Sequence, residues 1–135
     1  MKINLIRSIS DNPPDVTEHN NIAIDQIDGI GNSICQSLIL QDVLQYISLE
    51  QLKILLNKMR HGGAITIHCV DMFEVAKALY WGTIDVDRLS SLISGAISYH
   101  SVITIKSFLE QQRYIIEEAH VNVESLSFII KAKRP

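Results

Sequence analysis

Two nearly continuous apolar runs, separated by one amphipathic segment, constrain the fold of this chain more than any other feature. The runs are residues 34–40 (ICQSLIL) and 64–70 (AITIHCV). Runs of this length suit strands that are buried on both faces, as in a parallel sheet. Between them, Ser48 and Gln51 form a capping-box pattern, and leucines at helical spacing follow. We therefore predict two neighbouring parallel strands bridged by a helix that ends at Gly62-Gly63.

The remaining segments extend this alternation of strands and helices in both directions. Before the central unit, we predict strands at 2–6 and 22–24, a loop over 8–20 with Pro13-Pro14, and a turn over 28–32. After it, we predict helices at 73–80 and 86–97 and a further helix capped by Thr104. The chain then forms a C-terminal hairpin of strands 114–121 and 125–133, with its turn near Asn122. Buried strands that alternate with amphipathic helices imply helices covering a mostly parallel sheet. The predicted fold class is α/β: a three-layer sandwich with a mostly parallel, Rossmann-like sheet that ends in an antiparallel hairpin, in one domain over residues 1–135.

Composition restricts the class of partner and the compartment. Hydrophobic residues make up 47% of the chain and charged residues 20%, which is typical of a folded globular protein. The net charge of −3 and scattered basic residues exclude a broad nucleic-acid surface. Cys35 and Cys69 have no partner at zinc-site spacing, so we predict core thiols in a reducing compartment and no metal site. Without an apolar segment long enough for a signal peptide or a membrane span, the chain is expected to be cytoplasmic.

The central stretch of the chain resembles a known family. Residues 42–47 (DVLQYI), the pair Gly62-Gly63 and a strand that ends at Asp71 are similar to the fourth strand, glycine turn and fifth strand of class I methyltransferases that use S-adenosylmethionine. Tyr99-His100 with residues 104–109 resembles the segment before that family's last helix. The final hairpin is similar to the family's antiparallel sixth and seventh strands.

The first two strands resemble those of a compact type of these methyltransferases, which is found beside sugar and cell-envelope biosynthesis enzymes. Residues 2–5 (KINL) and 21–25 (NIAID) carry this similarity. The family has glycines after its first strand, whereas residues 6–10 (IRSIS) contain none. A Cβ at each position should crowd the approach to a cofactor, and the side chains of Ile6 and Arg7 fill space there. The link over residues 25–34 is also too short for a helix and a third strand, so we expect an abbreviated N-terminal half.

The resemblance implies a cofactor site for S-adenosylmethionine where the strand order of the sheet reverses. It implies that Asp25 accepts hydrogen bonds from the ribose hydroxyls, that Ser8 and Ser10 line the altered loop, and that Asp42 faces the cofactor or the acceptor. Asp71 is implied to border the substrate. The alternative for Asp25 is a turn residue, and Asp42 and Asp71 can instead cap connections between a strand and a helix.

Two other groups of residues invite a functional interpretation. His100 can serve as a general base for a hydroxyl acceptor, because histidine titrates near neutral pH; alternatively, it is a solvated or structural side chain. Gly29 and Gly31 follow a strand, but they precede another strand and lack a third glycine. We therefore predict a turn there rather than a dinucleotide site.

Two functions from different classes remain open. The first is an S-adenosylmethionine-dependent methyltransferase for a small-molecule or sugar acceptor, with catalysis by positioning of the two reactants. The second is a pseudoenzyme, a non-catalytic member that serves as a binding or assembly module and forms a homodimer to bury unpaired sheet edges. A different ligand in the cofactor crevice is a third possibility.

Overall fold

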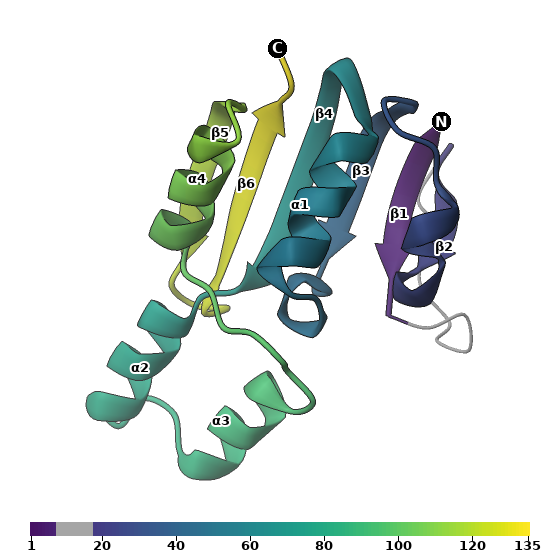
Figure 1. The fold of residues 1–135 in the computed structure, drawn as a ribbon. Coiled ribbons are helices and arrows are strands. Elements are labelled where there is room, and N and C mark those ends of the chain that lie inside the picture. The colour runs from purple at the N-terminus through teal and green to yellow at the C-terminus, as the bar shows by residue number, and fades with distance from the viewer. Residues whose placement is uncertain (8–17) are drawn as a thin grey trace.

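A single sheet organises the computed structural model, which describes residues 1–7 and 18–135. The strands of the described residues are β1 (Lys2–Ile6), β2 (Asn20–Ala23), β3 (Cys35–Gln41), β4 (Met59–Val70), β5 (Ile115–Asn122) and β6 (Ser127–Lys133). They are arranged in the order β2-β1-β3-β4-β6-β5 (Figure 1). The strands β2, β1, β3 and β4 are parallel to one another, whereas β6 is antiparallel to both β4 and β5. The predicted mixed α/β sheet with a C-terminal antiparallel hairpin is confirmed.

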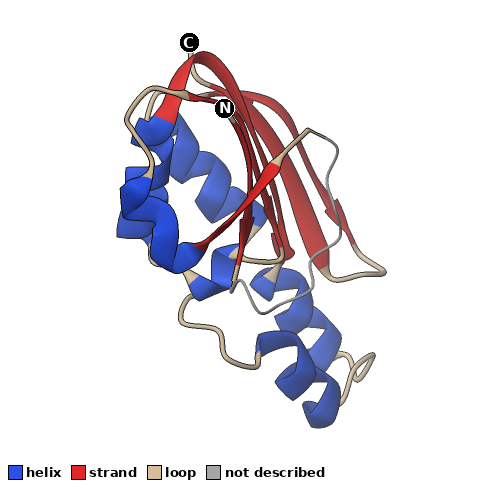
Figure 2. Ribbon diagram, turned by 90° about the vertical axis from the view of Figure 1, so that its right-hand side faces the viewer, coloured by secondary structure: helices blue, strands red, loops and turns tan. Residues whose placement is uncertain are grey.

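The described helices lie on one side of this sheet. They are the 3-10 helices η1 (Ile24–Gly29) and η2 (Leu44–Tyr46) and the α-helices α1 (Leu49–Lys58), α2 (Met72–Tyr80), α3 (Val86–Ile93) and α4 (Val102–Gln111). Figure 2 shows helices on one face of the strands, with α2 and α3 extending beyond the end of the sheet. Residues 1–7 and 18–135 thus form two layers, where we predicted three. The link from β2 to β3 contains η1, which lies on the same face of the sheet as α1 (Figure 1). None of the helices in these residues is long and apolar enough to cross a membrane.

The unit β3-α1-β4 has the predicted parallel arrangement. Ser48 Oγ accepts a hydrogen bond from the Gln51 backbone N–H at 3.1 Å, and Gln51 Oε1 accepts one from the Ser48 N–H at 2.9 Å, which confirms the capping box. The prediction that Gly62-Gly63 ends the helix is wrong, because α1 ends at Lys58 and both glycines belong to β4. A Cβ on Gly63 would lie 3.0 Å from the Cys35 carbonyl oxygen. Glycine is needed here because two strands approach closely, not because a helix stops.

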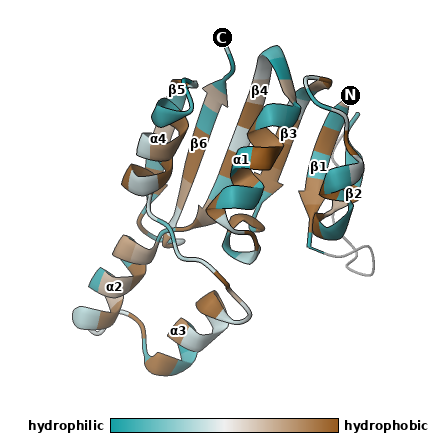
Figure 3. Cartoon of the chain, viewed as in Figure 1, coloured by the Kyte–Doolittle hydropathy of each residue, from teal (hydrophilic) through white to brown (hydrophobic). Residues whose placement is uncertain are grey.

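The hydrophobic core lies between the sheet and the helices α1 and α4, and Figure 3 shows hydrophobic residues in these helices and along the strands behind them. On β6, the alternate residues Phe128, Ile130 and Ala132 are buried, as the alternating pattern predicted. Cys35 and Cys69 are free thiols, each 1% exposed, which confirms the prediction of core cysteines. Burial of these apolar groups, at roughly 25 cal/mol per Å² removed from water, is the main force that holds the helices on the sheet.

Several predicted boundaries differ from the observed ones. The helix predicted over 86–97 ends at Ile93, and Gly95 follows with a positive φ of 73°. Ser101, not Thr104, is the N-cap of α4, and Thr104 supplies the reciprocal half of its capping box. Of the turn predicted over 28–32, residues 28 and 29 belong to η1, and a turn follows at residues 32 and 33. The hairpin turn is confirmed, since Asn122 Oδ1 accepts hydrogen bonds from the backbone of the next residues.

Candidate functional site

The order of the strands reverses at β1. The chain passes from β1 to its neighbour β2, and then crosses back to β3 on the other side of β1. All three strands are parallel, so their carboxyl ends lie at the same edge of the sheet. In open α/β sheets, ligands bind in the crevice outside the carboxyl ends at such a switch point. The topology therefore singles out this edge of the sheet before any side chain is considered.

A cavity of about 610 Å³ lies at this edge. Its volume falls in the range of roughly 300–1,000 Å³ that is usual for small-molecule sites. The residues that line it follow β1, belong to η1, η2 or α1, or lie in the segment after α3: Arg7, Ile24, Asp25, Ile27, Asp28, Tyr46, Gln51, Ile54, Gly95 and Ile97. We refer to this cavity as the crevice. It combines apolar walls with charged groups of both signs.

Two carboxylates of the crevice belong to η1. Asp25, which the sequence indicated, lines the crevice, and so does Asp28, which we had assigned to a turn. Residues three apart in a 3-10 helix project from the same side, so the helix explains why both acids face one cavity. Both residues are exposed, and neither carboxylate accepts a hydrogen bond from any donor in residues 1–7 and 18–135. Their oxygens are free to accept hydrogen bonds from hydroxyl groups of a ligand.

Arg7 supplies the positive charge of the crevice. It follows the last residue of β1, and its guanidinium carbon lies 4.2 Å from the centre of the Tyr46 ring, in a cation–π arrangement. The Tyr46 hydroxyl donates a hydrogen bond to the Ser94 carbonyl at 3.4 Å, which connects η2 to the segment after α3. The sequence predicted that Arg7 fills the space left by absent glycines. The structure adds that its charged group is held against an aromatic ring.

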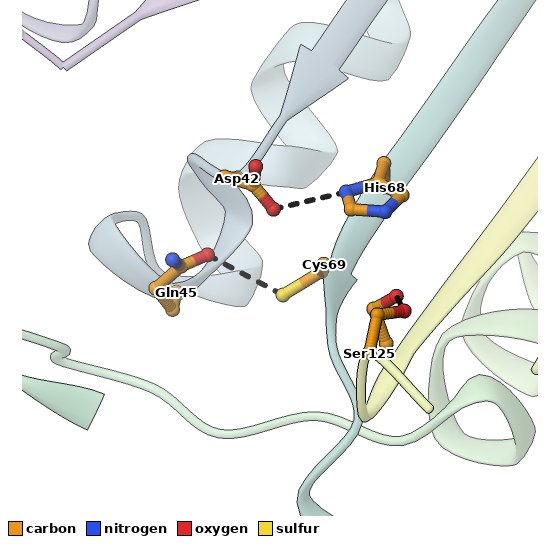
Figure 4. A network of polar contacts seen from close by, with 6 residues as sticks. Asp42, Gln45, His68, Cys69 and Ser125 are labelled. Carbon is orange, nitrogen blue, oxygen red and sulfur yellow. Dashed lines mark hydrogen bonds and ion pairs between the residues drawn. The ribbon is translucent and has the colours of Figure 1, made fainter. Parts of the chain in front are cut away.

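Asp42 lies outside the residues that line the crevice. Its carboxylate accepts a hydrogen bond from Nδ1 of His68 at 2.9 Å, and its backbone N–H donates to the His68 carbonyl at 2.8 Å. Figure 4 shows this pair between the ends of β3 and β4, with Gln45 and Cys69 facing each other beside it. Asp42 also has a positive φ of 57°, and Ser48 rather than Asp42 caps the following helix. The position of Asp42 favours a role in joining two strands.

Asp71 and His100 are both buried and away from the crevice. Asp71 is 1% exposed and is the N-cap of α2, so the capping alternative describes it best. His100 is 7% exposed, its Nε2 is hydrogen-bonded to Ser98 Oγ at 2.9 Å, and burial lowers the pKa of its imidazole. These contacts favour a structural role for His100. Ser8 and Ser10, predicted for the cofactor loop, lie outside the described residues.

No family model and no curated protein matches this sequence. Solved structures with a similar fold do exist. A methyltransferase from Archaeoglobus fulgidus, described as dependent on S-adenosylmethionine, superposes with a TM-score of 0.54 at 13% identity, over 87% of this chain and 68% of that one. A geranyl diphosphate C-methyltransferase from Streptomyces coelicolor A3(2), in complex with Mg²⁺, geranyl diphosphate and S-adenosylhomocysteine, gives 0.57 at 10% identity, over 87% and 55%.

A geranyl diphosphate methyltransferase bound to geranyl diphosphate and sinefungin gives a TM-score of 0.58 at 10% identity. This chain covers 54% of that structure. The two geranyl diphosphate methyltransferases are thus nearly twice as long as the part that this chain matches. Identities this low establish the fold alone. The chain has the fold of class I S-adenosylmethionine-dependent methyltransferases, in a shortened form.

Proposed function

We propose that this chain binds S-adenosylmethionine in the crevice and transfers its methyl group to a small-molecule or sugar acceptor. The observation that supports this most directly is the position of the crevice. It lies at the switch point of a methyltransferase-type sheet, and two unpaired carboxylates, Asp25 and Asp28, stand in its wall. The two buried free cysteines agree with the cytoplasmic location that we expect.

The side chains of the crevice suit the nucleoside part of this cofactor. Carboxylate oxygens of Asp25 and Asp28 are acceptors for the two ribose hydroxyls. Ile24, Ile27 and Ile54 add apolar surface against which a purine ring can pack. The volume of about 610 Å³ is sufficient for a ligand of this size. These properties support the proposal independently of the fold.

When bound, S-adenosylmethionine supplies an electrophilic methyl group on its sulfonium. The contribution of this chain is to bind and orient the cofactor and the acceptor, which alone accelerates such reactions strongly. His100 is buried outside the crevice, so we do not assign it the removal of a proton from the acceptor. The acceptor is therefore expected to be a group that is nucleophilic without help from this histidine.

Calorimetric titration with S-adenosylmethionine and S-adenosylhomocysteine tests the binding step. We expect micromolar dissociation constants, and about a tenfold loss of affinity in Asp25→Asn or Asp28→Asn, since each loses a charge-assisted hydrogen bond. Asp42→Asn is the matched control and should bind like the unaltered protein. Flat heats with both ligands would refute the proposal. Release of S-adenosylhomocysteine in the presence of an acceptor panel then tests transfer.

A specific observation also favours the second function, a non-catalytic dimeric module. Parallel sheets are normally covered on both faces, yet the described helices cover only one. The uncovered face is crossed by the row Ile39, Thr66, Lys131 and Glu118, whose polar members are only partly buried or exposed. A homodimer formed through this face would cover the second side of the sheet. Sedimentation should then give a dimer, and a strict monomer would count against this function.

A further inference from the structure

We infer that Arg7 forms an oxyanion subsite of the crevice. In this subsite, the guanidinium binds the negatively charged group attached to the 5′ side of an adenosine-type ligand. The group is the carboxylate of an S-adenosyl amino acid, or the phosphate of an adenosine nucleotide. The inference rests on the proposed function and deepens it, because it assigns a binding residue to the charged group of the ligand, which Asp25 and Asp28 do not bind.

The guanidinium is held in a way that leaves its donors available. Its carbon lies 4.2 Å from the Tyr46 ring centre, so the aromatic ring covers one side of the group. The N–H donors of a guanidinium point outward in its plane, and a stacked guanidinium keeps this edge for a bidentate carboxylate or phosphate. Within residues 1–7 and 18–135, no carboxylate lies within 4 Å of Arg7 in an ion pair. A ligand oxyanion therefore meets no competing internal partner among these residues.

The surroundings of Arg7 are shaped to hold its side chain. A Cβ on Gly95 would lie 3.0 Å from a terminal nitrogen of Arg7 and 3.6 Å from the Tyr46 ring. The backbone at Gly95 thus approaches both side chains more closely than a larger residue would allow. The Tyr46 hydroxyl is also hydrogen-bonded to the Ser94 carbonyl at 3.4 Å. Two segments that are distant in the sequence, η2 and the residues after α3, therefore fix the orientation of Arg7.

The distribution of charge matches a ligand with two kinds of polar group. Asp25 and Asp28 come from η1 and can accept hydrogen bonds from ribose hydroxyls, whereas Arg7 comes from the end of β1 and can only donate. A nucleoside that carries an oxyanion presents donors to the acids and acceptors to the guanidinium. In this chain, the Arg7 guanidinium thus binds the ligand at the end of β1, where residues 6–10 contain no glycine.

Calorimetry with two ligand pairs tests the subsite. S-adenosylhomocysteine is compared with 5′-methylthioadenosine, which lacks the amino-acid group, and AMP is compared with adenosine. In the unaltered protein, at least one oxyanion ligand should bind about tenfold or more tightly than its neutral partner, the usual size of a charged hydrogen bond. In Arg7→Met this preference should disappear while the neutral ligand binds as before. Arg7→Lys should keep part of the preference, because it retains the charge but not the planar fork.

Gly95→Ala and Gly82→Ala form a matched pair for the shape of the subsite. Both glycines have a positive φ, of 73° and 74°, so both substitutions strain the backbone alike. Only the Cβ at Gly95 would meet Arg7, whereas nothing lies within 4 Å of a Cβ at Gly82. Gly95→Ala should therefore reduce the oxyanion preference at least threefold, and Gly82→Ala should leave it unchanged.

The outcomes separate this inference from the proposed function. Equal binding within both pairs, of S-adenosylhomocysteine with 5′-methylthioadenosine and of AMP with adenosine, would overturn the subsite while leaving the proposed cofactor in place. Binding of AMP, but not of either S-adenosyl compound, would support the subsite and overturn the proposed function. A chain that binds none of the four ligands overturns both. Equal losses for charged and neutral ligands in Arg7→Met would show that Arg7 only shapes the cavity, and would overturn the subsite.

Discussion

The carboxylate of Asp71 accepts a hydrogen bond from the backbone N–H of Val102, 31 residues later in the chain, at 3.0 Å. Its other oxygen accepts bonds from the N–H groups of Phe73 and Glu74, the first turn of α2. Val102 is the first residue of α4. One buried side chain thus satisfies donors at the start of two helices. The unpaired N–H groups at a helix start need such acceptors, and an oxygen shared between two helices fixes their relative position.

Replacement of Asp71 should therefore cost more than the loss of an ordinary helix cap. In Asp71→Ala, three backbone donors, one in a buried and two in partly buried hydrogen bonds, lose a charged acceptor, and we expect the free energy of unfolding to fall by about 2–4 kcal/mol. Urea denaturation measures this directly. Asp85→Ala is the control, because Asp85 is exposed and caps α3 through one bond to the Arg88 N–H at 2.8 Å. Its expected cost is about 0.5–1 kcal/mol, and equal losses in both variants would contradict the shared-cap interpretation.

His100 should make the protein less stable in mild acid. Burial lowers the pKa of its imidazole below the ordinary value of 6.5, so the unfolded chain binds a proton more readily than the folded one. The stability that comes from a neutral His100 is complete above pH 6.5 and is lost as the pH falls from 6.5 toward the folded-state pKa. We expect the free energy of unfolding, measured in urea between pH 7.5 and 5, to decline across this window.

A pair of variants isolates the contribution of this histidine. His100→Gln cannot be protonated, so its stability should depend less steeply on pH below 6.5, even if lost packing lowers its stability at pH 7.5. His61 is exposed on β4, and His61→Gln should keep the slope of the unaltered protein. An unchanged slope in His100→Gln would show that other groups cause the acid sensitivity.

The two cysteines should be unreactive in the folded protein. Burial, with a smaller contribution from the charge of Asp42, raises the pKa of the Cys69 thiol to about 12. Burial also raises the pKa of Cys35, and each residue is 1% exposed. Because the thiolate is the reactive form, a disulfide reagent at pH 8 should modify neither thiol within minutes. Both should react immediately in denaturant, and one rapidly modified thiol without denaturant would contradict the buried positions.

Gly63 should tolerate substitution poorly, although it lies inside a strand. The Cβ of Gly63→Ala would meet the Arg60 carbonyl at 2.9 Å and the Cys35 carbonyl at 3.0 Å. Since these are backbone atoms, the local backbone of β4 and its spacing from β3 must both change, and we expect a loss of about 1–3 kcal/mol in the free energy of unfolding. Gly29→Ala meets nothing within 4 Å and serves as the control in the same thermal or urea experiment. A neutral Gly63→Ala would show that β3 and β4 adjust without cost.

The sequence predicted best those features that depend on local periodicity. The apolar runs of β3 and β4, the Ser48 capping box and the alternation along β6 all follow from neighbouring residues, and each was confirmed. Helix ends were harder to place, as Gly62-Gly63 illustrates. A glycine pair ends a helix or permits close strand contact, and the choice depends on residues that are distant in the sequence.

The candidate site was predictable only in part, for a similar reason. Asp25 could be indicated because it follows a strand, but Asp28 gained significance only when η1 turned it toward the same cavity. The stacking of Arg7 on Tyr46 joins residues 39 positions apart, and no local pattern encodes it. Asp71 and His100 looked like candidates for chemistry because their residue types are reactive. Their burial and their backbone partners could be known only from the fold.

The crevice draws its walls from chain segments as distant as Arg7 and Gly95, so it exists only when the whole domain is assembled. Anything that occupies it must therefore favour the assembled state over the unfolded ensemble. At a concentration one hundred times its dissociation constant, such an occupant adds about 2.7 kcal/mol to stability. A rise in melting temperature is thus a general reporter for compounds that enter the crevice, and it requires no knowledge of the reaction that they undergo.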